Sequence, residues 1–86
     1  MLRVRPVIGV EDIKAAVFIS ADHIVEGGAA IDIVRCFQHP RLERIHRYDF
    51  ARTQKTTRSW RVDGRLTSKL DQALAWLNAP APEARR

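Results

Sequence analysis

The chain has 86 residues, of which 45% are hydrophobic and 29% are charged, and its formal net charge is +5. This length excludes two independent cores, so we expect one basic α+β domain over residues 1–79 and a disordered, proline-containing tail over 80–86. No apolar run approaches the roughly 18 residues that cross a bilayer, and a single cysteine excludes an internal disulfide, which together predict a cytoplasmic protein.

The positive charge is concentrated in one segment. Residues 1–34 contain three cations and five acids, whereas residues 35–65 contain nine cations and three acids. Eight of those nine cations are arginines, and the planar guanidinium suits phosphate better than the point charge of lysine does. The distribution therefore favours an anionic polymer as the partner, against the alternative that a basic surface serves only solubility.

Near the N-terminus, residues 2–10 alternate loosely and predict a short edge strand. Over residues 12–38, apolar residues recur at spacings of three and four, which predicts two helices joined at Gly27 and Gly28. An alternative reading takes 15–20 and 30–37 as strands, because β-branched residues are dense in both. The residues at helical spacing are Ile13, Ala16 and Val17 before the glycines and Ala30, Ile33, Val34 and Phe37 after them.

Residues 44–64 are predicted to form an antiparallel β-hairpin, because one pairing register places apolar residues together on one face and pairs opposite charges on the other. In that register Phe50 lies opposite Trp60 and Tyr48 lies opposite Val62, which gives one apolar face to bury. A shift by one residue would break the pattern on both faces. The opposite face then pairs unlike charges across the strands, Asp49 with Arg61 and Arg47 with Asp63.

The last predicted element is a C-terminal helix over residues 67–78. Thr67 or Ser68 can cap its N-terminus, and Asp71 lies in the first turn, where the helix dipole favours an anion. Its apolar residues form one stripe, made of Leu70, Ala73, Leu74 and Leu77.

This order of elements (helices, a glycine joint, a further helix, a basic hairpin and a closing helix) resembles a winged helix-turn-helix domain over residues 12–78. The expected fold class is therefore α+β, a small winged-helix-like domain with helices over 12–38, an antiparallel hairpin over 44–64 and a C-terminal helix over 67–78. The resemblance implies a helix in the DNA major groove that exposes Arg35 and Gln38, with the hairpin tip against the backbone or minor groove.

The expected function is that of a small DNA-binding protein, a transcriptional regulator, with duplex DNA favoured over RNA and a homodimer as a possible state. Its basic hairpin would neutralise phosphates. The alternative is an interaction module or accessory protein that docks on an acidic partner surface. The predicted phosphate contacts are Arg41, Arg44, Arg52, Lys55 and Arg58, and Arg35 and Gln38 complete the predicted site.

Neither an enzyme nor a metal or cofactor site is expected. Cys36 and His39 form a C-x-x-H pair with His23 and His46 elsewhere, but structural zinc sites usually contain two close, cysteine-rich pairs. A ribonuclease toxin is a further alternative, in which His46 would act as acid or base. Strand alternation, however, assigns His46 to the predicted buried face, and the chain carries no phosphate-binding loop or nucleophile motif.

Overall fold

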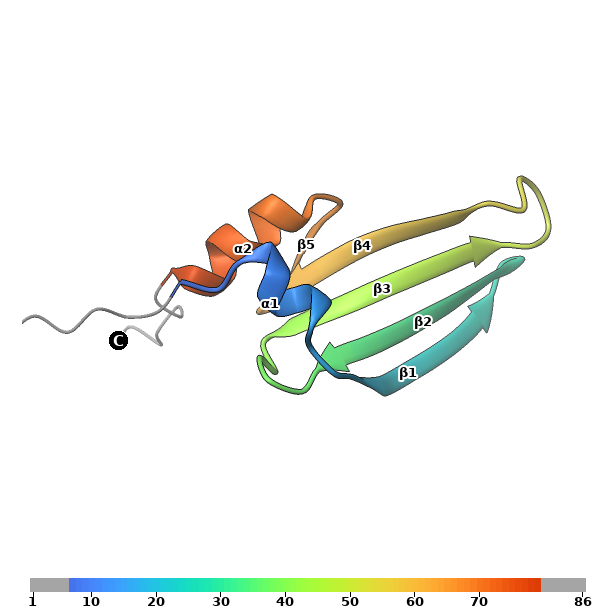
Figure 1. Ribbon diagram of the computed structural model, residues 1–86. Helices are drawn as coiled ribbons and strands as arrows, with labels where there is room; N and C mark the ends of the chain where they lie inside the picture. Colours follow the sequence, from blue (N-terminus) through green and yellow to red (C-terminus); the bar gives the residue numbers. More distant parts are fainter. Residues whose placement is uncertain (1–6, 80–86) are drawn as a thin grey trace, which may run out of the picture.

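The computed structural model describes residues 7–79, which form an antiparallel sheet with two short helices (Figure 1). Each strand pairs with the next strand in the chain, so the sheet order is β1-β2-β3-β4-β5. In chain order the elements are α1 (Val10–Lys14), β1 (Phe18–Glu26), β2 (Ala29–Cys36), β3 (Leu42–Asp49), β4 (Thr56–Val62), β5 (Arg65–Thr67) and α2 (Leu70–Asn78).

The predicted winged-helix-like fold is wrong, because strands occupy most of residues 12–38. The helix α1 ends at Lys14, and β1 and β2 then form a long antiparallel pair. Dense β-branched residues favour extended backbone, and pairing with β3 satisfies the hydrogen bonds of β2. The alternative interpretation as strands is therefore correct for β2, whereas β1 begins later than the alternative placed it and continues to Glu26.

Gly27 and Gly28 form a tight hairpin turn between β1 and β2 and do not join two helices. Their φ angles are +62° and +80°, and a two-residue turn with two positive φ angles matches the right-handed twist of the strands it connects. A Cβ atom at Gly28 would also lie 2.6 Å from the Cβ of Ala51, so any other residue there would collide with the β3–β4 loop.

The chain does fold back over residues 44–64, but the predicted register is wrong. Trp60 lies opposite Arg44, and Val62 lies opposite Leu42. The shift is by an even number of residues, so each side chain keeps its predicted face while its partners change. The true register places Leu42, which the predicted hairpin did not include, in the core.

Unlike charges are paired across the sheet, as the hairpin prediction required, but by other residues. Glu43 accepts hydrogen bonds from Arg61 on one side and Arg35 on the other, at 2.6 Å and 3.2 Å. Asp63 is paired with Arg41. Glu43 therefore takes the place predicted for Asp49 as the partner of Arg61, and Arg41 takes the place predicted for Arg47 as the partner of Asp63.

The helix α2 begins at Leu70, three residues later than expected, and its N-cap Lys69 makes no side-chain capping bond. The Thr67 hydroxyl instead accepts a hydrogen bond from the Lys69 amide. At the other end, the Asn78 side chain exchanges hydrogen bonds with the backbone of Ile8, which fastens the N-terminal segment to the helix. The strand expected over 2–10 does not form at residues 7–9; residues 1–6 and the predicted tail at 80–86 lie outside the described residues.

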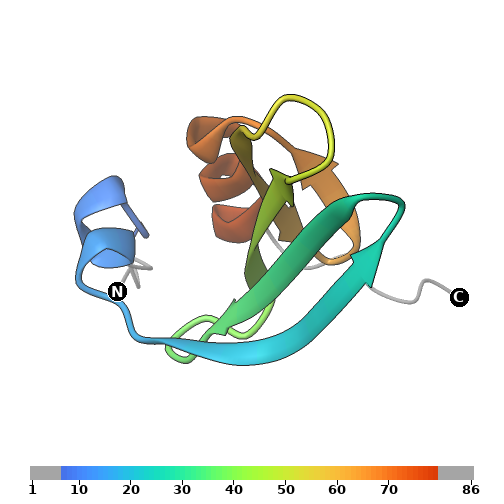
Figure 2. The same ribbon diagram turned by 90° about the vertical axis from the view of Figure 1, so that its right-hand side faces the viewer.

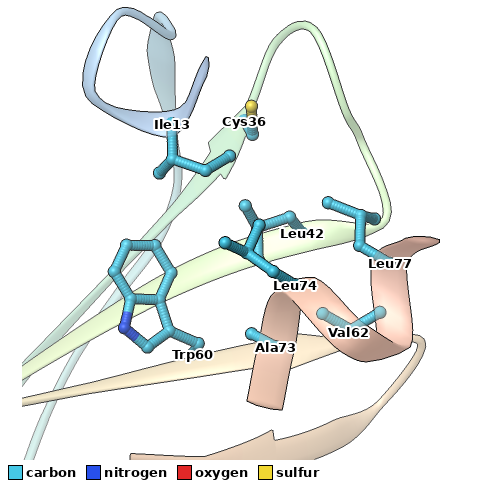
Figure 3. Close-up of a cluster of buried hydrophobic side chains, with 8 residues drawn as sticks. All are labelled: Ile13, Cys36, Leu42, Trp60, Val62, Ala73, Leu74 and Leu77. Atoms are coloured by element: carbon cyan, nitrogen blue, oxygen red, sulfur yellow. The ribbon is translucent and has the colours of Figure 1, made fainter. Parts of the chain in front are cut away.

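Both helices pack on the same face of the sheet, at one end of the strands (Figures 1 and 2). The core lies between that end and the helices and is small, as expected for a chain of this length. The strands continue past the helices, so the distal half of the sheet has no helix over it (Figure 1). The core residues, drawn in Figure 3, are Ile13, Cys36, Leu42, Trp60, Val62, Ala73, Leu74 and Leu77.

The strand β1 forms one edge of the sheet and is irregular. Its pairing with β2 shifts between Ser20 and Asp22, so Ala21 has no partner and the strand bulges there. Among residues 7–79, no helix is long and apolar enough to span a bilayer.

Candidate anion-binding groove

The candidate site lies on the helix-covered face of the sheet, just beyond the core. Side chains of a strand alternate between faces, and in the β3–β4 register Arg44 lies opposite Trp60 and His46 lies opposite Arg58. Trp60 is buried in the core, so all four side chains share the core face. The register therefore brings two arginines and a histidine together, directly outside the apolar cluster.

This face is hollowed by a groove in two adjoining parts of about 490 Å³ and 510 Å³, which share Arg58, Trp60 and Leu70. The first part runs under α1, where Lys14, Phe18 and Arg44 line it. The second part is lined by His46, Thr56 and Ser68 and runs away from the helices along β4.

The charged side chains that line the groove are all basic. Within residues 7–79, no salt bridge involves Arg44 or Arg58, while Lys14 makes only a loose exposed contact of 3.8 Å with Glu11. The Arg44 guanidinium stacks 4.3 Å from the centre of the Phe18 ring, and its Nε atom is buried without a hydrogen-bond partner. A buried donor with no partner costs free energy, and no acceptor among the described residues fixes the Arg44 guanidinium in place.

The cations in the groove destabilise one another. Burial lowers the pKa of Arg44, and the nearby Arg58 charge lowers it further. The pKa of His46 also lies below its ordinary value, because the ring is partly buried and faces Arg44 and Arg58, although Asp32 opposes the effect. The neutral His46 ring accepts a hydrogen bond from Arg58 Nε to its own Nε2 at 3.2 Å.

The lowered pKa of His46 predicts a loss of stability in mild acid. As the pH falls below about 6.5, the unfolded chain takes up a proton at His46 that the folded chain resists, so unfolding becomes more favourable. His46→Gln can still accept the Arg58 hydrogen bond but cannot titrate. Thermal melts at pH 7.5 and 5.5 should therefore show a smaller loss in the variant, and an equal loss in both proteins would contradict the assignment.

Three residues of the predicted site have structural partners instead. Arg35 lies on the opposite face of the sheet and pairs with Glu43. The Gln38 side chain accepts a hydrogen bond from the Val17 amide at 2.9 Å, which ties the start of β1 to the end of β2. Arg41 donates to both carboxylate oxygens of Asp63 and to the Leu77 and Trp76 carbonyls.

Arg52 and Lys55 lie in the loop between β3 and β4, at the distal end of the sheet. The Asp49 carboxylate organises this loop, since it accepts hydrogen bonds from the Arg52 amide and the Thr53 hydroxyl. Both cationic side chains belong to exposed residues. The structure thus brings Arg44 and Arg58 together and leaves Arg52 and Lys55 farther along the same hairpin.

The cysteine and histidines considered as metal ligands or catalytic groups do not form one site in the described residues. Cys36 is fully buried in the core. His23 pairs with Asp32 on β2, and the described residues contain no cluster of three or more metal-ligating side chains. His46 is only half-buried and lines the groove, so the expectation that it packs inside the protein is wrong.

No known protein family, curated protein or solved structure matches this chain. The groove must therefore be interpreted from its own chemistry. Sequence reasoning missed Lys14, which reaches the groove only because α1 packs across the sheet. No local signal in the sequence places that helix there.

Proposed function

We propose that this protein binds nucleic acid through the phosphate groups. The observation that carries the proposal is the convergence of Arg44 and Arg58 in one groove, with no described carboxylate paired to either and with Arg44 Nε lacking a partner. Phosphate oxygens are strong acceptors that a guanidinium fork can bind through two hydrogen bonds at once.

The rest of the hairpin supports a polymer over a small anion. Arg52 and Lys55 extend the positive charge from the groove to the β3–β4 loop, and the net charge of +5 favours association with a polyanion at long range. The expected recognition helix does not exist, because β2 occupies residues 29–36. Reading of the DNA major groove by a helix is therefore not part of the proposal, and a role in transcription stays a sequence prediction.

The free and buried Cys36 fits a reducing compartment, so we place this function in the cytoplasm. The proposal is one of binding without catalysis. Neutralisation of phosphates by arginine requires neither a metal nor a cofactor.

The test is a salt titration of oligonucleotide binding by fluorescence anisotropy, on wild-type protein and two matched variants. Arg58→Gln removes one charge from the groove, and Arg35→Gln removes one charge from the opposite face. We expect Arg58→Gln to weaken binding about tenfold at low salt and to reduce the slope of log affinity against log salt by about 0.7 to 0.9. Arg35→Gln should change neither quantity.

Absence of binding at low salt, or binding that salt does not weaken, would overturn the proposal. Competition with polyglutamate tests the alternative of an acidic protein partner. If polyglutamate displaced the oligonucleotide at an equal concentration of negative charge, the surface would accept any acidic chain. Recovery of shortened RNA from the same titrations, abolished by His46→Ala, would reassign the groove to ribonuclease activity.

A further inference from the structure

Two exposed aromatic side chains lie at the distal end of β3: Tyr48 is in the strand and Phe50 is in the loop that follows it. The distal half of the sheet has no helix over it (Figure 1). Tyr48 is 42% exposed and Phe50 is 45% exposed, and their ring centroids are 6.4 Å apart. Single exposed apolar residues are common on soluble proteins and need no explanation. Two rings in mutual contact beside a row of cations are a more specific feature.

The aromatic pair continues the groove. Tyr48 follows Arg44 and His46 along the same face of β3, and it lies opposite Thr56, which lines the distal part of the groove. Tyr48 lies four positions after Arg44 in the strand, a distance of about 13 Å. Stacked bases rise by about 3.4 Å each, so a strand of roughly four to six nucleotides would reach from the arginines to the rings.

The loop that carries Phe50 is held in place. Two backbone hydrogen bonds connect Asp49 with Lys55 and Gln54, at 3.1 Å and 2.7 Å, and the Ala51 amide donates to the Gly28 carbonyl across the β1–β2 turn. The rings therefore lose little conformational entropy when a ligand covers them.

We infer that this surface takes single-stranded nucleic acid, with phosphates bound at Arg44 and Arg58 and unpaired bases stacked on Tyr48 and Phe50. The inference rests on the proposed function and adds the class of ligand. Bases of a single strand expose faces that can stack on aromatic rings, whereas bases within a duplex are already stacked on each other. Duplex DNA, favoured by the sequence, would leave these two rings unused.

The test compares a mixed-sequence single strand of about eight nucleotides with the same strand annealed to its complement, as RNA and as DNA, by anisotropy at low salt. We expect the single strand to bind more tightly than the duplex. Tyr48→Ala should lower the affinity for the single strand about tenfold and leave the affinity for the duplex unchanged. Tyr48→Phe keeps the stacking ring and should retain the affinity of the wild type.

Phe37→Ala is the matched control, because Phe37 is 64% exposed and follows the proximal end of β2, away from the hairpin tip. It should bind both forms as the wild type does. Equal affinities for RNA and DNA would mean that the protein recognises only bases and phosphates. Tighter binding of RNA would mean that it also contacts the 2′-hydroxyl groups.

Salt-dependent binding with a duplex preferred to the single strand, or with Tyr48→Ala indistinguishable from Phe37→Ala, would overturn this inference and leave the proposed function intact. Absence of binding to every oligonucleotide would overturn both.

Discussion

Replacing Leu42 with alanine is expected to destabilise the protein by about 3 kcal/mol. Leu42 is fully buried between β4 and α2, opposite Val62, and truncation would remove contacts and leave a cavity in a core of only eight buried residues. A domain of this length has a total stability of about 4 to 13 kcal/mol, and the loss should lower the midpoint of thermal denaturation by roughly 12 to 24 °C.

Leu66→Ala is the control for that experiment. It makes the same chemical change at a side chain that is 61% exposed on the edge strand β5. Its midpoint should stay within a few degrees of the wild type, because an exposed truncation changes stability by about 0.5 kcal/mol or less. Similar losses in the two variants would mean that the cluster around Leu42 does not form the core.

Arg41→Ala is expected to cost somewhat less, about 2 kcal/mol, although the sequence pointed to this residue as a phosphate contact. The Arg41 side chain holds Asp63 through hydrogen bonds of 2.6 to 3.1 Å and reaches the Trp76 and Leu77 carbonyls. The loss would free the turn after β4 and leave carbonyls at the end of α2 without a partner. Chemical denaturation measures the loss, and oligonucleotide affinity should be unchanged in the folded variant.

The effect of Arg41→Ala should also depend on pH with a defined sign. The hydrogen bonds from Arg41 hold the pKa of Asp63 below its ordinary value of 3.8. The stabilisation is therefore complete above about pH 4 and is lost as the pH falls through the lower, folded pKa. The wild type and the variant should converge in acid. Arg35→Ala removes the more exposed of the two partners of Glu43 and leaves the 2.6 Å hydrogen bond from Arg61, so it should change stability less than Arg41→Ala does.

The sequence predicted correctly those elements whose spacing of apolar residues is compatible with only one type of secondary structure. The stripe formed by Leu70, Leu74 and Leu77 marks α2, since three residues at that spacing lie together only on a helix. Trp60 and Val62 lie on the predicted buried face, because alternation depends on residue parity, which an even shift in register preserves. The prediction that Tyr48 and Phe50 are buried on that face is wrong: both are exposed, and Phe50 follows the end of β3.

The sequence favoured helices in place of β1 and β2 because these strands lack a regular alternation of apolar and polar residues. The helices cover the sheet on one face and only at one end, so few strand positions need to be apolar. In β2, Ile33 is buried on one face while Cys36 is buried on the other, so apolar residues do not alternate and happen to match helical spacing. The informative signal was Gly27-Gly28 between two β-branched segments, a common two-residue hairpin turn.

The groove could not be predicted in full because it depends on register and on packing. With the predicted pairing, Arg58 would lie opposite Arg52, far from Arg44. The observed pairing places Arg58 opposite His46, two pairs along the strands from Arg44 and on the same face. Sequence composition identified the right segment as basic, but only the three-dimensional arrangement distinguishes Arg44 and Arg58 from Arg41, whose charge is already neutralised.

The unpaired Ala21 has a consequence for how the protein behaves at high concentration. An open sheet edge invites another copy to add its own strand, which is the first step toward fibrils. In β1 the row of outward backbone groups is interrupted at Ala21, and the acids Asp22 and Glu26 follow the interruption. A second copy laid along this edge would meet a kink and extra negative charge, so strand addition along β1 should be disfavoured.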